Sequence, residues 1–478
     1  MKKFLKTYFY LILLGLVLWI TTAWLSVGYY QADEHYQILE FALYKQQVIQ
    51  QSDLAWEYQA QLRPGLQPWI AANFLNATKA IGISDPFLQT ALLRMITSLL
   101  FFVLFIFLTV KLLWEYPTRK YTWLLPALGL FLWFIPFVAC RFSSETWSAL
   151  FFFAGVLPFV GRKNKPKPLT LIVSGFALGL SFHFRYQAII LIAGLFLWLL
   201  LMNKAQLKNV LLLTAGLIPA LFAGILADKW LYNEWAFPFI NYLDFNIFSG
   251  QANETFGTSP WWYYFGRFAE KSAIVPGSIV LLSLFYFLFK NPRHLFNWLW
   301  LPFLVAHMFT GHKELRFLIP VFPVIPFVLF YMFQETRQYF TLKRFVLNPL
   351  ITLALTLNFF MLIILAYSPA EFSVKALEEI QKNPAKSNTV YYSGENPASP
   401  FGLPNNFYTN KTMTFEKVDS LPATASGSKY IYITYKGALP EEFATTKPVL
   451  QSIPSILRFF NFNGWLDRTT RSELRILD

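Results

Sequence analysis

The chain contains little cysteine and little charge. Only one of its 478 residues is cysteine, Cys140, so neither a disulfide nor a cysteine-based metal site can form within the chain. Charged residues make up 14% of the sequence, whereas hydrophobic residues make up 55% and aromatic residues 19%. A single soluble core cannot enclose so many apolar side chains, of which 52 are phenylalanine. The composition excludes an ordinary soluble protein and predicts an integral membrane protein.

Several motifs of nucleotide and metal chemistry are also missing. The sequence has no glycine-rich phosphate loop, no His-Glu-x-x-His motif and no Asp-x-Asp pair. Without paired aspartates, a divalent metal that grips a nucleotide-sugar diphosphate is disfavoured. A membrane-embedded monophosphate donor, held by Lys and Arg, fits better. We therefore expect neither a metal nor another cofactor.

Apolar runs of about 17 to 25 residues, the length of a membrane-crossing helix, fill the first three quarters of the chain. They predict an all-α polytopic protein with about 11 transmembrane helices. Lys2, Lys3 and Lys6 precede the first run, as in a signal peptide, but no Ala-x-Ala site follows and the run is long, which favours an uncleaved first span. The predicted spans lie near 8–27, 86–112, 122–140, 143–160, 169–184, 186–202, 209–227, 273–289, 295–311, 317–334 and 345–367.

The net charge of +14 would suit nucleic acid, but the cations lie in short segments beside the apolar runs. They occupy every second connection, which obeys the positive-inside rule if the N-terminus is cytoplasmic. The other connections, and the C-terminal tail, are then extracytoplasmic, and no nucleic-acid partner is expected. The inner clusters are Lys111/Arg119/Lys120, Arg162/Lys163/Lys165/Lys167, Lys204/Lys208, Lys290/Arg293 and Arg337/Lys343/Arg344.

The composition changes after residue 367. Alternating stretches at 389–392 and 430–435 predict β-strands, so we expect a small C-terminal α/β domain over 368–478 that follows a transmembrane domain over 1–367. The transmembrane domain has a long first outer loop, 28–85, and a central outer loop, 228–268. In the first loop, apolar residues at helical spacing near 33–45 and 64–81 predict helices that lie in the membrane interface.

The first outer loop contains candidate functional residues. A carboxylate of Asp33 or Glu34 can accept a proton from a substrate hydroxyl, although an acidic pair at the end of a span is usually only solvated. Trp56, Glu57 and Arg63 form an aromatic and charged group that suits a sugar ring and equally suits a membrane interface.

Further candidates lie at the outer ends of later spans. Arg141 and Arg185 need partners there, because an unpaired guanidinium in a membrane is costly. The alternatives are a structural pair of Arg141 with Glu145 and snorkelling of Arg185. The loop that begins at Asp228 is rich in aromatic side chains, Asn and Gly, and can wall a carbohydrate pocket or lie in the interface as a lid.

The sharpest cluster is His312-Lys313-Glu314-Leu315-Arg316, with four ionisable residues in five positions. Lys and Arg can grip a phosphate there, Arg through two hydrogen bonds, while Glu314 can fix Lys313 or Arg316. A solvated turn is the alternative. It is disfavoured because three potential cations on an outer turn oppose the prevailing charge pattern.

These pieces, in this order, resemble the GT-C mannosyltransferases of glycosyltransferase family 22, which extend glycosylphosphatidylinositol anchors and lipid-linked oligosaccharides, and their bacterial relatives. His35 departs from the family pattern, which commonly has an aromatic residue there, and Asn233 stands where Gly is common; the composition suggests a bacterial relative. The matching islands are Asp33-Glu34-x-x-Gln37, Trp56-Glu57-Tyr58 with Arg63, Arg141 with Glu145, Arg185, Asp228-x-x-x-Tyr232, Phe245-Asn246, Gly257-Thr-x-Pro260-Trp261-x-Tyr263 and His312-Lys313-Glu314-x-Arg316-Phe317.

The resemblance implies an enzyme that transfers mannose from a polyprenyl (dolichyl-type) phosphate mannose to a glycan or glycolipid acceptor with inversion, forming an α-mannoside. By the same resemblance Asp33 is the general base, and Arg185, His312, Lys313 and Arg316 bind the donor phosphate. The implied acceptor contacts or supporting residues are Glu34, Gln37, Trp56, Glu57, Arg63, Arg141, Glu145, Asp228, Tyr232, Asn246, Trp261, Tyr263 and Glu314. The rival functions are a lipid-linked glycan transporter and a ligase-type GT-C enzyme that uses a lipid-diphosphate donor.

Overall fold

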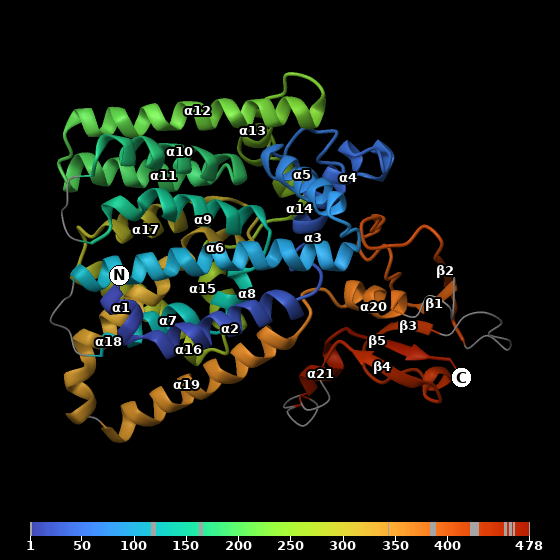
Figure 1. Cartoon of the computed structure of the whole chain (residues 1–478). Helices are drawn as coiled ribbons and strands as arrows, with labels where there is room; N and C mark the ends of the chain where they lie inside the picture. The colour runs from blue at the N-terminus through green and yellow to red at the C-terminus, as the bar shows by residue number, and fades with distance from the viewer. Residues whose placement is uncertain are drawn as a thin grey trace. The chain divides into compact units, whose positions relative to one another are not determined.

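The computed structural model describes residues 2–115, 121–161, 166–342, 344–382, 389–420, 430–453, 457, 461 and 464–477. Most of them are helical (Figure 1). The chain divides into two compact units, one of residues 1–25, 57–70 and 92–368 and the other of residues 26–56, 71–91 and 369–478. Arg119, Lys120, Arg162, Lys163, Lys165 and Lys343, which we assigned to inner clusters, lie outside the described residues.

The first unit is built from helices, because a helix satisfies the backbone hydrogen bonds of an apolar segment internally. It begins with α1 (Lys2–Thr7), α2 (Phe9–Leu25), α6 (Pro86–Glu115), α7 (Leu124–Phe131), α8 (Ile135–Ala139), α9 (Ser144–Val156), η2 (Leu157–Phe159), α10 (Pro168–Phe184), α11 (Ala188–Leu197), the π-helix η3 (Trp198–Met202) and α12 (Leu207–Tyr232). It continues with α13 (Pro238–Leu243), the π-helix η4 (Asp244–Phe248), α14 (Gln251–Phe256), α15 (Tyr263–Lys271), α16 (Val275–Lys290), α17 (Leu295–Phe309), η5 (Leu315–Val324), α18 (Ile325–Leu342) and α19 (Arg344–Tyr367).

Helices occupy each of the predicted apolar runs. Among the described residues, four helical segments are long and apolar enough to cross a membrane, and five shorter apolar helices accompany them. The number of eleven crossings stays a prediction. The four long segments are Pro86–Glu115, Leu207–Tyr232, Leu315–Arg337 and Asn348–Tyr367.

The helices differ from the predicted spans at three places. The run 122–140 is broken between α7 and α8, where Pro136 stands in the first turn of α8. The run 317–334 begins as a 3-10 helix, η5, which contains Pro320 and Pro323. Helix α12 continues to Tyr232, so Asp228 and Tyr232 lie on a helix and not in the central loop.

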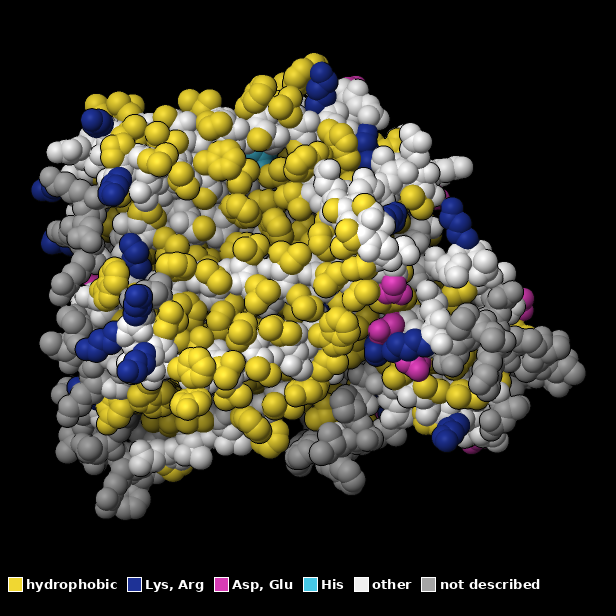
Figure 2. All heavy atoms as spheres, in the orientation of Figure 1, with side chains coloured by type: hydrophobic (Ala, Val, Ile, Leu, Met, Phe, Trp, Pro, Cys, Tyr) yellow, Lys and Arg dark blue, Asp and Glu magenta, His cyan; other side chains and the backbone are white. Residues whose placement is uncertain are grey.

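Small residues allow close contact between the helices. α10 packs along α12 and also contacts α11 (Figure 1). At their crossing a Cβ on Gly175 would lie only 1.9 Å from the carbonyl oxygen of Leu213, so only glycine fits. Figure 2 shows hydrophobic side chains over the visible face of these helices, with Lys and Arg gathered at its left edge. A lipid-facing surface with basic residues at one end has this distribution.

The second unit contains a mixed five-stranded sheet of order β2-β1-β3-β5-β4. β1 pairs in parallel with β2 and β3, whereas β5 pairs antiparallel with β3 and β4. The predicted strands at 389–392 and 430–435 are confirmed as β1 and β3. The strands are β1 (Thr389–Ser393), β2 (Thr414–Lys417), β3 (Tyr430–Tyr435), β4 (Lys447–Gln451) and β5 (Arg471–Ile476).

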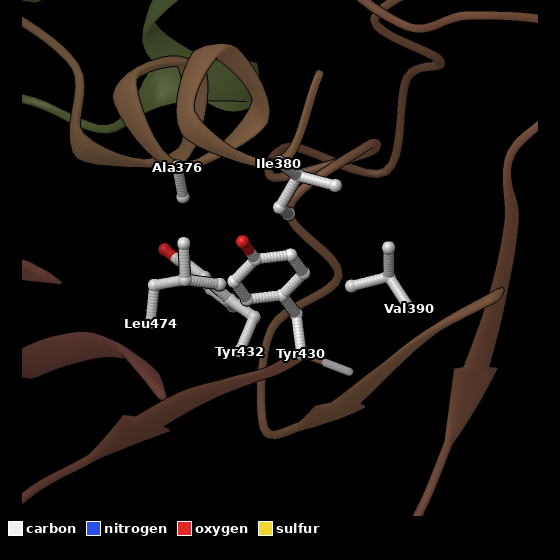
Figure 3. Close-up of a cluster of buried hydrophobic side chains, with 6 residues drawn as sticks. All are labelled: Ala376, Ile380, Val390, Tyr430, Tyr432 and Leu474. Atoms are coloured by element: carbon white, nitrogen blue, oxygen red, sulfur yellow. The ribbon is translucent and has the colours of Figure 1, made fainter. Parts of the chain in front are cut away.

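One helix covers one face of this sheet. α20 (Phe372–Gln381) directs Ala376 and Ile380 onto Val390, Tyr430, Tyr432 and Leu474 (Figure 3). The opposite face has a second apolar cluster around Ile431 and Ile433. Two buried faces give this small domain a core of its own. The short helices beside it are η7 (Glu441–Phe443) and α21 (Trp465–Arg468).

Residues of the first outer loop belong to the same unit as the sheet. They form α3 (Ala32–Tyr36), α4 (Leu39–Lys45), η1 (Gln51–Asp53) and most of α5 (Leu66–Ala80), which confirms helices at both predicted places. The carbonyl oxygen of Val27 accepts hydrogen bonds from the backbone N–H groups of Ala370 at 2.8 Å and Glu371 at 3.1 Å. Residues 26–56 and 71–91 therefore form one compact unit with the C-terminal residues.

Candidate functional site

In the first unit, two helix ends place a carboxylate against a guanidinium. Glu145 lies in the first turn of α9, and Arg185 is the residue that caps the C-terminal end of α10. Arg185 Nη1 lies 2.9 Å from Glu145 Oε1 and donates to Ser144 Oγ at 3.2 Å. The exposed fractions of the two side chains are 7% and 3%, so each charge depends on the other for compensation.

A second pair comes from the segment between α17 and η5. Arg316 meets Glu314 at two points, with Nε 2.7 Å from Oε2 and Nη2 2.8 Å from Oε1. Arg316 Nη1 lies 3.7 Å from Glu145 Oε1, so Glu145 stands between two guanidinium groups. His312 Nε2 lies 3.2 Å from Glu314 Oε1. We call Glu145, Arg185, Glu314 and Arg316 the charge cluster.

Aromatic side chains enclose the charge cluster. The ring of Phe317 lies 5.1 Å from Arg185 Cζ and 5.6 Å from Arg316 Cζ, and its π face attracts both cations. Tyr264 of α15 is almost fully buried, and its hydroxyl has no hydrogen-bond partner among the described residues. Burial, with Tyr263 and Glu314 nearby, raises the pKa of Tyr264, so its hydroxyl stays protonated and can donate.

Lys313 has a different environment from the two arginines. Its Nζ donates to the carbonyl oxygens of Ser259 at 2.6 Å, Gly311 at 3.3 Å and Thr310. An ammonium group has three N–H donors, and all three are thus directed at backbone carbonyls. Burial lowers the pKa of Lys313. These contacts indicate that Lys313 fastens the 257–263 segment to the turn after α17, and its predicted contact with phosphate stays a prediction.

A strap of residues 57–67 lies over the end of α12. Tyr232 Oη donates to the carbonyl oxygen of Arg63 at 2.7 Å and accepts from its N–H at 3.3 Å. The N–H of Gly65 donates to Asp228 Oδ1 at 2.6 Å. A Cβ on Gly65 would lie 2.2 Å from the carbonyl oxygen of Ala227, so the strap requires glycine at this point. Asp228 and Tyr232 are therefore placed as structural supports of the strap.

The other candidates of the first unit have local contacts. Glu57 Oε1 lies 3.5 Å from Arg63 Nη2 within the strap. Arg141 is buried with its Cζ 5.1 Å from the ring of Phe137, and the carboxylate of Glu145 meets Arg185 at 2.9 Å. Asn246 Nδ2 donates to the carbonyl oxygen of Tyr242 at 2.9 Å.

Two aromatic candidates of the central loop pack on their neighbours in the chain. Trp261 is 56% exposed and stands edge-on to Trp262, and Tyr263 stands edge-on to Tyr264. An exposed Trp pair suits a membrane interface.

In the second unit, Asp33 and Glu34 occupy the first turn of α3. Asp33 is half-buried, whereas Glu34 is buried and its Oε2 accepts from the N–H of Tyr30 at 2.9 Å. Gln37 is buried at the end of the same helix. Trp56, at the end of this part of the chain, is 43% exposed. Glu34 therefore fixes the entry to α3, and Asp33 is the more accessible carboxylate.

The sequence did not reveal how α3 is held. His35 is fully buried between the rings of Tyr29 and Tyr408, stacked at centroid distances of 4.9 Å and 5.4 Å. Its Nε2 lies 2.9 Å from Glu40 Oε1, which also accepts from the N–H of Phe407 at 2.9 Å. The imidazole ring thus stacks as an aromatic side chain would, at the position where the resemblance leads one to expect an aromatic residue. Its departure from that pattern was the available signal.

Within the described residues, no three His, Cys, Asp or Glu side chains come together as a metal site would require. The expectation that no metal takes part stays a prediction.

The apolar helices of the first unit and the small sheet of the second define a helical membrane protein with a GT-C fold. The fold is similar to that of ArnT from Cupriavidus metallidurans in its crystal structure bound to undecaprenyl phosphate, with a TM-score of 0.56, 9% identity and 98% of each chain covered. The model of the Alg9-like mannosyltransferase family matches residues 8–396. The chain belongs to this family.

Curated relatives agree with this placement. GPI mannosyltransferase 3 of Candida albicans is 27% identical over 334 residues, which is 69% of this chain and 64% of the relative. A probable Dol-P-Man:Man(7)GlcNAc(2)-PP-Dol alpha-1,6-mannosyltransferase of Schizosaccharomyces pombe is 25% identical over 61% of this chain and 54% of the relative. The human GPI alpha-1,2-mannosyltransferase 3 is 23% identical over 80% of this chain and 67% of the relative. The chain thus spans less than two thirds of the length of the first two.

Proposed function

We propose that this chain is an integral-membrane, inverting mannosyltransferase that uses a polyprenyl-phosphate mannose donor and forms an α-mannoside on a glycan or glycolipid acceptor. The observation that carries the proposal is the charge cluster, in which one buried carboxylate, Glu145, stands between the guanidinium groups of Arg185 and Arg316. The name of the fission-yeast relative contains Dol-P-Man, and the solved ArnT structure holds undecaprenyl phosphate; both support a lipid-phosphate donor.

The charge cluster has the chemistry that a phosphate leaving group needs. Guanidinium groups bind phosphate oxygens through paired N–H donors. Arg185 and Arg316 are held in place by Glu145 and Glu314, so a phosphate meets cations that are already oriented. The Tyr264 hydroxyl supplies a neutral donor to the same ligand. His312 supports Glu314 at 3.2 Å.

Asp33 acts as the general base in this proposal. The acceptor oxygen attacks C1 of mannose from the face opposite the phosphate, and the C1–O bond to the phosphate breaks with its electron pair on the phosphate oxygen. The acceptor proton passes to the Asp33 carboxylate. No proton has to reach the phosphate, because its charge is stabilised by the arginines. Asp33 is half-buried whereas Glu34 is buried, and this difference in accessibility supports Asp33 over its neighbour.

We also propose about eleven spans, with a cytoplasmic N-terminus and the charge cluster on the extracytoplasmic side. The run of α11 supports this orientation. Arg185 of the charge cluster precedes its first residue, whereas Lys204 and Lys208 follow η3 at its other end. Lys and Arg residues in short connections, outside a functional site, mark the cytoplasmic side.

The test is mannosyl transfer in detergent with EDTA, from synthetic polyprenyl-phosphate mannose to a panel of α-mannosyl acceptors, for wild type and Asp33→Asn. The wild type should release polyprenyl phosphate, and Asp33→Asn should be slower by about 10³-fold because an amide cannot take the proton. Donor binding should survive the substitution. Asp53→Asn, the same change in η1 of the same unit, is the matched control and should retain activity.

Three results would count against these assignments. Activity of Asp33→Asn close to that of the wild type would remove Asp33 from the role of base. Failure of the folded wild-type protein to bind the donor at all would remove the donor assignment. Loss of activity on addition of EDTA would overturn the metal-free mechanism.

A further inference from the structure

A cavity of about 590 Å³ lies at the ends of the helices of the first unit that are opposite the charge cluster. Its wall includes residues of α10, η3, α12 and the first turn of α17. α10 alone has 17 residues between this end and Arg185, a rise of roughly 25 Å at 1.5 Å per residue. The cavity is therefore separate from the candidate site of the first unit by about the thickness of a bilayer core.

The wall of the cavity is cationic. Lys204 and Arg293 line it and are exposed, and Glu115 is the only acidic residue among the described residues that line it. Glu115 Oε1 lies 3.4 Å from His294 Nε2. Because His294 Nδ1 accepts from the N–H of Phe296 at 3.1 Å, a neutral ring carries its proton on Nε2, toward Glu115. The one carboxylate is thus engaged, which leaves two cations for an anionic ligand.

The two cations are held on connected segments. The indole N–H of Trp198 donates to the carbonyl oxygen of Arg293 at 2.9 Å, which joins η3 to the start of α17. The turn after η3 is fixed by a bond of 2.9 Å from the N–H of Ala205 to the carbonyl oxygen of Leu199. Lys204, within that turn, has a φ of 48°, which is uncommon for a residue with a side chain. The fold therefore holds Lys204 at the cavity in a backbone conformation that is unfavourable for a residue with a side chain.

Much of the remaining wall is apolar, and Asn203, Gln206 and Asn209 add polar side chains to it. Leu171, Leu199 and Val210 line the cavity, and on the same helices Ile172 and Leu211 are 37% and 58% exposed. In a membrane such exposed side chains face lipid. A ligand with an anionic head and an apolar chain fits this combination better than a small anion, because only the amphiphile also covers the apolar wall.

We propose that this cavity binds an anionic phospholipid of the leaflet at that end of the helices. Its phosphate lies against Lys204 and Arg293, and the first carbons of its chains lie along Leu199 and Val210. Phosphate and guanidinium or ammonium groups form charge-assisted hydrogen bonds, and the apolar contacts add to the affinity. The site is distinct from the donor and acceptor sites of the proposed function and does not depend on them.

The test is photolabelling of the purified full chain in nanodiscs. The probes are phosphatidylglycerol and phosphatidylcholine, each with a diazirine near the start of one acyl chain, and labelled peptides are mapped by mass spectrometry. The phosphatidylglycerol probe should label peptides within 198–210 and 293–296 several-fold more than the phosphatidylcholine probe. In the double variant Lys204→Gln/Arg293→Gln this labelling should fall about tenfold, the loss expected for one or two charged hydrogen bonds.

Lys208→Gln is the matched control, because Lys208 is exposed one turn away in α12 and does not line the cavity. It should keep the labelling of the wild type. Equal labelling by phosphatidylcholine, or unchanged labelling of the double variant, would overturn phosphate recognition. Displacement of the label by millimolar glycerol 3-phosphate would show that a soluble phosphate is the ligand and would overturn the lipid assignment.

Discussion

At the scale of single residues, the buried cations have divided roles. Arg185 and Arg316 contact carboxylates that hold them beside Phe317, whereas Lys313 contacts backbone carbonyls. Arginine suits the first role because its planar group offers several donors at once. Lysine suits the second because one ammonium can gather three carbonyls.

Replacing Lys313 by Met should therefore lower the stability of the protein, without removing a direct contact with the donor. The carbonyls of Ser259, Thr310 and Gly311 would lose their donor, at a cost of about 2 kcal/mol. Thermal unfolding in detergent should show a lower midpoint for Lys313→Met than for the wild type. Lys271→Met, at the exposed end of α15, should leave the midpoint unchanged. An unchanged midpoint with abolished donor binding would instead place Lys313 on the phosphate.

Tyr264→Phe tests the unpartnered hydroxyl. The change removes one oxygen from an almost fully buried side chain, so folding should be preserved and donor affinity should fall about tenfold. Binding of a fluorescent polyprenyl-phosphate analogue measures this. Tyr10→Phe, at a position 84% exposed on α2, should bind like the wild type. Equal affinity of Tyr264→Phe would exclude the hydroxyl from the donor site.

At the scale of elements, the strap 57–67 is set by one glycine. Gly65→Ala would push a methyl group to 2.2 Å from the carbonyl oxygen of Ala227, so the strap must lift from α12. We expect about 2 kcal/mol of destabilisation and reduced activity. Gly266→Ala on α15, where a Cβ meets open space, is the control for the same change. Wild-type stability of Gly65→Ala would mean that the strap does not need its contact with α12.

The helices could be predicted from the sequence because apolar runs signal them locally. The candidate residues could also be placed at the ends of spans, since charge is rare elsewhere in the runs. The pairing could not be predicted: Glu145 was weighed as a partner of Arg141, but the packing of α9 against α10 brings it to Arg185. The break before α8 and the 3-10 start at η5 depend on prolines whose local effect the hydropathy pattern does not contain.

At the scale of the whole molecule, the second unit joins most of the first outer loop to the C-terminal residues. No local pattern indicates this, because the contact between Glu40 and Phe407 spans 367 positions. The sheet itself has a core on each face. The loop, in contrast, depends on contacts with C-terminal residues: His35 stacks on Tyr408, and Glu40 accepts from the N–H of Phe407.

A chain truncated after Ser368 should therefore lose order in its first outer loop. Without residues 369–478 the ring of His35 loses one of its stacking partners and Glu40 loses its backbone donor. Trypsin should cut at Lys45 faster than in the full chain, while cleavage at the exposed Lys204 of the first unit serves as an internal reference. Equal protection at Lys45 in both chains would show that the loop holds its structure without the C-terminal residues.

The composition of the second unit also fixes an order of events during synthesis. The ribosome completes α3 and α4 early, but their partners at Tyr408 and Phe407 are translated about 367 residues later. At 5–20 residues per second this delay is roughly 20–70 s. During that interval the spans are inserted while the segment that contains Asp33 still lacks its packing partners. A chain released early therefore lacks the residues against which α3 and α4 pack.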